Sequence, residues 1–335
     1  MNKSALMLNW QKCYYCTNDR NGGKLILNGT EIIALLSNGL ESMSSAVGAV
    51  AGGLFTVIFL RHNTKTEEFE KIKAGQFKEV ADDLLASGKM TYTEYYKANN
   101  FLTVAKKADS YYREHPRTCE KDVYDFDWFM RFFEAVGNVS DDMMQNLWAK
   151  ILAGEVARPS TFSLRTIDIV RNLSKRDAEL FIRICSHSFM ASSSNYFLPN
   201  EKEFLESVGI KYIDIMKLSE LGLLFNDATI IFNISISNKP KLLINSNSLI
   251  MFITSASGNS EEASIGQYPF TEVGKELSTL ISEGPSDDDY IKYGQSLSRN
   301  KSYKISLHKV IKWNDDSIEY DKTDLITSEE PNVQR

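Results

Sequence analysis

Cysteine and histidine are the residues of this chain best suited to metal or redox chemistry, but few of them stand at a useful spacing. Cys13 and Cys16 form a CYYC near the start, whereas Cys119 and Cys185 lie far downstream. A structural zinc site needs four ligands, usually two such pairs or one pair with two spaced histidines. The histidines stand singly, at His62, His115, His187 and His308. The sequence therefore predicts no metal site, no cofactor and no disulfide framework, and we favour two small thiols over a redox pair for the CYYC.

Carboxylates in the middle of the chain are the other candidates, since paired acids serve acid–base or metal-assisted catalysis. They are Asp125, Asp127, Glu134, Asp141 and Asp142. Asp141 and Asp142 follow Ser140 and precede a helical pattern, where a capping side chain and negative charge favour a helix start. No histidine or third carboxylate stands at ligand spacing, so we expect capping and solvated faces. The sequence predicts no catalytic residue.

Common catalytic motifs are missing from the sequence. It contains no P-loop, Rossmann glycine fingerprint, GxSxG elbow or HExxH, so the usual nucleotide, hydride, hydrolase and zinc-protease mechanisms lack their starting residues. We therefore favour a non-enzymatic protein, although an unfamiliar enzyme stays open. The formal net charge of -6 over 335 residues argues against a dominant nucleic-acid surface, which normally leaves a basic footprint.

The chain also contains an uncharged apolar run near its start, MSSAVGAVAGGLFTVIFL, from Met43 to Leu60. About 20 apolar residues at roughly 1.5 Å each span the hydrocarbon core, so this run is near the threshold for a transmembrane helix. Gly48 and Gly52 form a small-xxx-small pair, which lets helices pack closely. The candidate residues for a membrane or oligomer contact are Gly48, Gly52, Leu54, Phe55, Ile58 and Phe59.

Positive charges near the run indicate how such a helix would be oriented. Arg61, Lys65, Lys71 and Lys73 follow it, and residues 30–42 before it contain no lysine or arginine. We therefore expect a bacterial inner-membrane location with a cytoplasmic C-terminal body. The alternatives are a cytoplasmic protein that buries this helix, or a helix covered only in a homo-oligomer.

Charge and hydropathy patterns divide the chain into five parts. Residues 1–62 are predicted as an N-terminal arm and the apolar helix, and 63–120 as a hairpin of amphipathic helices. Residues 121–190 contain several short helical patterns and form a central helical domain. Residues 195–313 combine short helices with strand-like stretches and predict a winged-helix-like α+β module, followed by an acidic tail at 314–335. The fold class that we expect is mainly α.

Three stretches show their periodicity clearly. Thr91 to His115 carries one apolar stripe and is predicted as an amphipathic helix closed by Pro116. Asp287 to Leu297 is predicted as a helix, and Tyr303 to Trp313 alternates like a strand. Each should appear as a regular element of the fold.

The second main helix of the winged-helix-like module is the part that would read DNA. Such a helix should offer Arg, Lys, Asn or Gln to base edges. This one offers Lys211 and Lys217 against Asp214 and Glu220, so we expect it to contact protein or assemble an oligomer. A better candidate cluster for nucleic acid or a partner lies upstream, at Arg165, Arg171, Lys175 and Arg176.

One phrase in the central segment resembles a known family. LWAKILAGEVARPSTFSLRTIDIVRNLSKRDAELF, Leu147 to Phe181, resembles the bacterial domain of unknown function DUF2806 and, more distantly, the abortive-infection alpha proteins, DUF4393. The likeness extends more loosely over most of the chain. It implies a helical domain followed by a wing-like module, no established activity and no catalytic residue. From the abortive-infection relatives it implies a role in limiting phage.

These features predict a non-enzymatic, membrane-associated bacterial protein that acts as an anti-phage effector or sensor of the abortive-infection type. Its expected partners are further copies of itself, the membrane and a phage or host trigger protein. The alternative is a soluble homo-oligomeric scaffold, or a winged-helix regulator that binds protein or nucleic acid.

Overall fold

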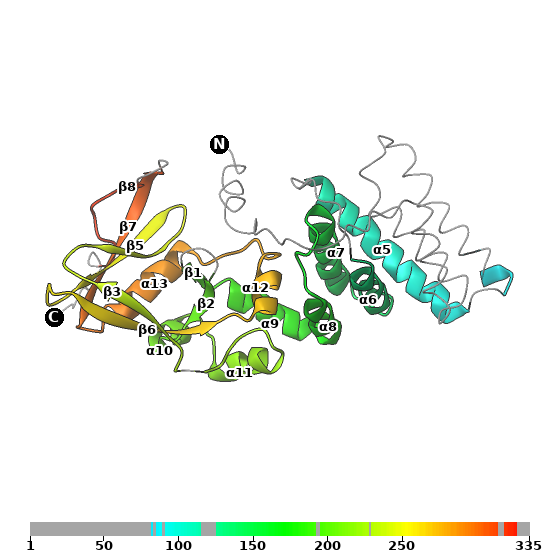
Figure 1. The fold of residues 1–335 in the computed structure, drawn as a ribbon, viewed down its shortest axis with the longest axis horizontal. Coiled ribbons are helices and arrows are strands. Elements are labelled where there is room, and N and C mark those ends of the chain that lie inside the picture. The colour runs from blue at the N-terminus through cyan, green and yellow to red at the C-terminus, as the bar shows by residue number, and fades with distance from the viewer. Residues whose placement is uncertain are drawn as a thin grey trace, which may run out of the picture. The chain divides into compact units, whose positions relative to one another are not determined.

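The computed structural model describes residues 82, 85–88, 91–114, 125–191, 195–227, 229–313 and 318–326. They belong to two compact units, and the division between the units falls between Lys175 and Arg176. This division lies inside the stretch 121–190 that the sequence pattern grouped into one central domain. Helices and strands carry the numbers used in Figure 1.

The unit that ends at Lys175 is helical throughout its described residues. Its helices are α5 (Tyr92–Glu114), α6 (Phe126–Val136), α7 (Asp142–Ala157) and α8 (Leu164–Asn172). Helices α5 and α7 pack against each other side by side (Figure 1), and α6 contacts both α5 and α8. The buried ring of Phe101 on α5 meets Phe129 and Phe132 of α6 edge-on, and Phe132 meets Trp148 of α7 in the same way. An aromatic core therefore joins these helices.

Acidic side chains begin α6 and α7, as the sequence predicted for α7. Asp141 is the N-cap residue, and its carboxylate accepts a hydrogen bond of 3.1 Å from the Met144 backbone N–H. Asp142 lies in the first turn and forms an ion pair with Lys107. The prediction that these two carboxylates serve the helix start is therefore confirmed. Asp125 caps α6 in the same way.

The loop between α7 and α8 folds around a buried carboxylate. Glu155 accepts hydrogen bonds from the backbone N–H groups of Ser160, Thr161 and Phe162, at 2.6, 3.0 and 3.0 Å. Ser160 has a positive φ of 65°, a conformation that costs energy in a residue with a Cβ. The Trp128 indole N–H donates to the Phe162 carbonyl at 2.8 Å and fixes the far end of the loop.

The unit that begins at Arg176 combines helices with two sheets. Its helices are α9 (Lys175–Cys185), α10 (Lys202–Ser207), α11 (Tyr212–Glu220), α12 (Glu272–Ser278) and α13 (Asp287–Leu297). Its strands are β1 (Phe189–Ala191), β2 (Asn195–Pro199), β3 (Ile231–Ile236), β4 (Lys241–Asn245), β5 (Leu249–Ser255), β6 (Glu261–Pro269), β7 (Tyr303–Trp313) and β8 (Ile318–Tyr320). All their pairings are antiparallel, in the orders β1-β2-β6-β3 and β4-β5-β7-β8.

The first sheet belongs to a helix-turn-helix arrangement. Along the chain α9, β2, α10 and α11 lead into β3 and β6, and β6 lies between β2 and β3 in the sheet. This is the order of a winged helix-turn-helix, with β3 and β6 as the wing. The turn between α10 and α11 passes through Gly209 at a φ of 70°, where a glycine avoids the strain of a Cβ. Strands β4 and β5 are inserted within the wing.

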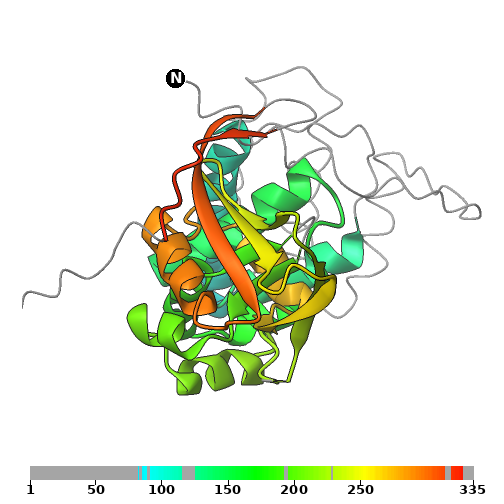
Figure 2. The same ribbon diagram turned by 90° about the vertical axis from the view of Figure 1, so that its left-hand side faces the viewer.

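The second sheet continues from this insertion. Strand β5 pairs with β7 from Leu249 opposite Lys309 to Ser255 opposite Tyr303. Helix α13 contacts β5 and β7, and Figure 2 shows it beside the long β7 strand. The buried Tyr290 of this helix donates its hydroxyl to the Asn245 carbonyl at the end of β4, at 3.0 Å. The α13 helix therefore covers the second sheet.

The expectation of a mainly α fold is wrong. The described residues are about 47% helical and 23% strand, with two antiparallel sheets of four strands each, so the fold is α+β. The error came from assigning the strand-like stretches to one small wing. The stretch 241–254 is a hairpin of β4 and β5, and its pairing with β7 creates a complete second sheet.

The expected inner-membrane location is also not supported. None of the described helices has the length and apolar character needed to cross a bilayer. The longest of them, α5 with 23 residues, carries many charged side chains and buries only one side. The apolar run Met43 to Leu60, with its candidate residues Gly48, Gly52, Leu54, Phe55, Ile58 and Phe59, lies outside the described residues.

The α7–α8 loop leads to a stability prediction. The substitution Glu155→Gln replaces one carboxylate oxygen with an NH₂ group that faces backbone N–H donors. We expect it to lower the free energy of unfolding by about 1–3 kcal/mol, because at least one buried donor loses its acceptor. Urea unfolding of the purified protein measures this change.

Glu134→Gln is the matched control, because Glu134 is exposed on α6 and its side chain should matter little. Burial is the largest influence on the pKa of Glu155 and raises it above its ordinary value against the opposing effect of the backbone hydrogen bonds. Stability from this group therefore falls as the pH rises from the unfolded pKa through the raised folded pKa. Equal stabilities of the two variants would contradict the role given to Glu155.

Candidate functional site

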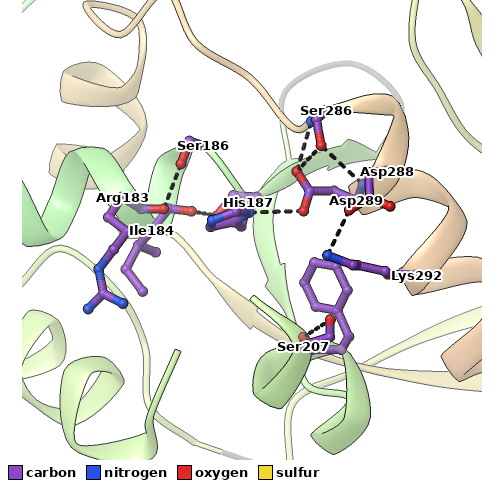
Figure 3. A network of polar contacts seen from close by, with 11 residues as sticks. Arg183, Ile184, Ser186, His187, Ser207, Ser286, Asp288, Asp289 and Lys292 are labelled. Carbon is purple, nitrogen blue, oxygen red and sulfur yellow. Dashed lines mark hydrogen bonds and ion pairs between the residues drawn. The ribbon is translucent and has the colours of Figure 1, made fainter. Parts of the chain in front are cut away.

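A histidine, an aspartate and a serine meet where the end of α9 lies near the start of α13 (Figure 3). His187 Nδ1 lies 3.0 Å from Asp289 Oδ1, and Asp289 Oδ2 accepts hydrogen bonds of 2.8 Å from both the N–H and the hydroxyl of Ser286. In a nucleophilic triad the serine hydroxyl would instead bond to the imidazole. Ser286 also accepts the Asp289 N–H, which makes a capping box at the start of α13. The arrangement therefore caps a helix and contains no activated nucleophile.

The charge on Asp289 is stabilised where it lies. Asp289 is only 3% exposed. Burial is the largest influence on its pKa and raises it, but the hydrogen bonds from His187 and Ser286 together outweigh burial, so the pKa lies below its ordinary value. The ionised carboxylate links residues that are 102 positions apart in the sequence. It therefore ties the segment after α9 to α13.

Helix α11 is the surface element that best fits a binding function. Ile215 and Leu218 face the core and are fully buried, whereas Tyr212 is 55% and Ile213 is 64% exposed. Both exposed side chains lie in the first turn of the helix. Because they are adjacent and apolar, they offer a surface suited to another apolar surface.

Most charges around α11 are occupied within the unit. Arg183 of α9 lies 3.0 Å from the Asp214 carboxylate and donates to the Gly209 carbonyl at 3.1 Å, which holds the turn between α10 and α11. Lys217 lies 2.6 Å from the Asp177 carboxylate of α9. These contacts hold α11 on α9 and leave fewer cations for phosphates or base edges.

Two charges of α11 remain available at its opposite ends. Lys211 precedes the first turn and Glu220 is the last residue of the helix, and both side chains are exposed. Within the part of the chain that the structure describes, neither forms an ion pair. The α11 surface, defined as Lys211, Tyr212, Ile213 and Glu220, therefore has a positive end beside the apolar pair and a negative end.

The basic residues proposed from the sequence are all exposed, but they do not lie in one unit. Arg165 and Arg171 lie on α8, and Lys175 lies 3.8 Å from the Asp141 carboxylate, all in the first unit. Arg176 lies in the other unit. The structure brings the two arginines onto one helix and does not fix a common surface for all four residues.

Metal and thiol chemistry find little support in the described residues. Among them, no group of three or more His, Cys, Asp or Glu side chains could hold a metal ion. The Cys185 thiol is buried, and burial raises its pKa well above the ordinary value, which keeps it unreactive at neutral pH. The CYYC of Cys13 and Cys16 lies outside the described residues.

The sequence interpretation did not identify Glu155, His187 or Asp289. Glu155 sits between apolar helix residues and its partners come from a loop that no periodicity predicts. The spacing of Ser286 and Asp289 is a local signal of a capping box that could have been found. The contact of His187 with Asp289 joins distant parts of the chain, and no local pattern indicates it.

Comparison with protein families gives one result. The model of the family described as protein of unknown function DUF2806 matches residues 86–294. The chain belongs to the DUF2806 family. The match covers α5 and the helix-turn-helix and ends inside α13. Membership in DUF2806 confirms the resemblance of Leu147 to Phe181 to this family, whereas the more distant likeness to the abortive-infection alpha proteins stays a prediction. Comparisons with curated proteins and with solved structures find no match.

The buried carboxylate of this DUF2806 protein leads to a second stability prediction. Asp289→Asn keeps the size of the side chain but removes the charge that His187 and Ser286 stabilise. We expect the free energy of unfolding at neutral pH to fall by about 1–3 kcal/mol, since a helix cap and a buried acceptor are weakened. Urea unfolding at several pH values measures the effect.

The loss of stability caused by Asp289→Asn should depend on pH. Because the pKa of Asp289 is lowered in the folded state, its stabilising contribution is present above the unfolded pKa of about 4 and is lost as the pH falls through the folded pKa. The difference between the native chain and Asp289→Asn should therefore shrink in acid. Asp288→Asn is the control, since Asp288 pairs with Lys292 at the surface (Figure 3). A larger loss from that control would refute the assignment.

Proposed function

We propose that this DUF2806 protein is a non-enzymatic scaffold that assembles into a homo-oligomer through the α11 surface. The observation that carries the proposal is the exposed pair Tyr212 and Ile213, at 55% and 64% exposure, on a helix whose free charges have opposite signs at its two ends. Fully burying one such side chain contributes about 1.5–3 kcal/mol. A second copy of the chain is the partner that the charges favour.

Two-fold symmetry explains why a second copy fits. A dimer of this kind uses the same surface on both subunits. When two α11 helices pack antiparallel, Lys211 of one copy lies toward Glu220 of the other, and the same contact repeats at the opposite end. The helix is about 13 Å long, so in this arrangement the apolar pair of each copy lies beside the Lys211–Glu220 contact at its own end of the crossing. One α11 surface is therefore complementary to itself.

Sequence-specific DNA binding by α11 is disfavoured by the same contacts. Arg183 and Lys217 are held by Asp214 and Asp177, and the remaining cation, Lys211, stands next to two apolar side chains. Nucleic-acid binding through the upstream cations is the competing function. Its signature is an affinity that falls with salt and with the neutralisation of Arg171 and Arg176.

A role in limiting phage is the finer part of this proposal. Its support is the distant likeness to the abortive-infection alpha proteins that the sequence Leu147 to Phe181 predicts. Cells that carry the gene should form fewer plaques than cells without it, and the variant Ile213→Asp should lose the protection if assembly is required. Equal plaque counts with and without the gene would remove this part of the proposal.

The apolar pair can be tested by matched substitutions. Ile213→Ser should weaken self-association roughly tenfold or more, because each dimer loses two buried side chains. Ile311→Ser is the control, since Ile311 is 63% exposed on β7 and Ile213 is 64% exposed. Sedimentation velocity over a range of protein concentrations measures both dissociation constants.

The charge arrangement can be tested by exchange. Lys211→Glu and Glu220→Lys should each weaken the oligomer, because like charges then face each other across the two-fold axis. The double variant restores opposite charges and should recover assembly. A native chain that stays monomeric at all concentrations would overturn the proposal, and salt-dependent DNA binding by that monomer would favour the competing function.

A further inference from the structure

A short segment near the C-terminal end follows β8 along the edge of the second sheet. Strand β8 pairs with only the last part of β7, from Val310 to Trp313. The chain then continues as residues 321–326, which we call the latch. Within the described residues, no strand pairs with β7 on this side before Val310. The latch therefore covers part of an otherwise open strand edge.

Main-chain hydrogen bonds hold the latch on β7. The Asp321 N–H donates to the Lys309 carbonyl, and the Leu325 N–H donates to the Leu307 carbonyl, both at 2.8 Å. In the other direction, the Leu307 N–H donates to the Asp324 carboxylate at 3.1 Å. Both main-chain groups of Leu307 are therefore occupied by the latch.

Two side-chain contacts complete the attachment of the latch. A Cβ atom at Gly294 of α13 would lie 2.5 Å from Ile326 Cδ1 and 3.2 Å from Met251 Cε, so the glycine makes room for Ile326. The imidazole N–H of His308 donates to the Thr323 carbonyl at 3.1 Å. The first three latch residues are exposed and the last three are half-buried. Segments with so little buried surface open locally at a lower cost in free energy than the core.

The edge of β7 beneath the latch is suited to pairing with another strand. In an antiparallel sheet, the N–H and C=O groups of every second residue point to the same side. Because those of Leu307 point to the latch, those of Ile305 and Tyr303 point to the same edge. The segment Tyr303 to Lys309 alternates apolar and polar residues and contains no proline. An open edge of this kind is a template for a further strand.

We propose that the latch controls a second mode of self-association, through the edge of β7. When the latch is open, the segment Tyr303 to Lys309 of one copy pairs antiparallel with the same segment of a second copy. The edge is complementary to itself, because two-fold symmetry places the same donors and acceptors on both strands. This pairing uses none of the residues of the α11 surface and does not depend on it.

Gly294→Ala opens the latch without changing its sequence. The added Cβ displaces Ile326, although alanine in place of glycine otherwise favours the α13 helix. The full-length chain also carries Ile213→Ser, which removes the proposed α11 contact. Hydrogen exchange of the Leu325 N–H should then become at least about tenfold faster than in Ile213→Ser alone. The Leu307 N–H should exchange rapidly in dilute protein and slowly in concentrated protein, because a second copy then supplies its acceptor, and sedimentation velocity should show dimers over the same range.

Asp324→Ala opens the latch in a second way, since it removes the acceptor of the Leu307 and Ile326 N–H groups and leaves α13 unchanged. Lys322→Ala is the control, because Lys322 is an exposed latch residue that forms no ion pair within the described part of the chain. Two results would each overturn the proposal. One is Leu325 exchange as slow in both latch variants as in the control, and the other is an open latch whose Leu307 exchange does not depend on protein concentration.

Discussion

A buried carboxylate needs hydrogen-bond donors around it, and each unit of this DUF2806 protein contains such a group. In the helical unit, Glu155 gathers three backbone N–H groups of the loop that joins α7 to α8. In the other unit, Asp289 completes the capping box of α13 with Ser286 and contacts His187 from the segment after α9. The donors in both cases come from irregular segments, so the carboxylates fix the parts of the chain that helices and sheets do not.

Internal contacts also distinguish the residues that hold the fold from the residues that are available for binding. Arg183 and Lys217 would be natural phosphate ligands, but their partners Asp214 and Asp177 make them internal connections between α9 and α11. The side chains of α11 that these contacts leave available are an apolar pair at the start of the helix and one charged residue at each end. In the helical unit Asp141 is likewise occupied as a helix cap. The proposed self-association rests on these available side chains of α11.

Local sequence patterns predicted single elements well and their assembly poorly. The helix Asp287–Leu297 and the strand Tyr303–Trp313 have the bounds that their periodicity predicted, and Asp141 and Asp142 lie at a helix start as expected, with Asp141 as the cap. The second sheet was missed because β5 and β7 pair across a long stretch of sequence that contains α12 and α13. Glu155 and Asp289 were missed for a related reason. Their donors are contributed by loops or by distant residues, which hydrophobic periodicity does not encode.

The DUF2806 match includes the β4–β5 insertion but ends before the strand that completes its sheet. The DUF2806 match ends at residue 294, before β7 and β8, yet β7 is the strand that pairs with β5 along its whole length. Gly294 itself lies against Ile326, which is further along the chain than either strand. A fragment cut at the end of the match would keep the β4–β5 hairpin but leave the backbone groups of β5 without their neighbour, and such open strands join other molecules indiscriminately. The folding unit is therefore longer than the segment by which its relatives are recognised.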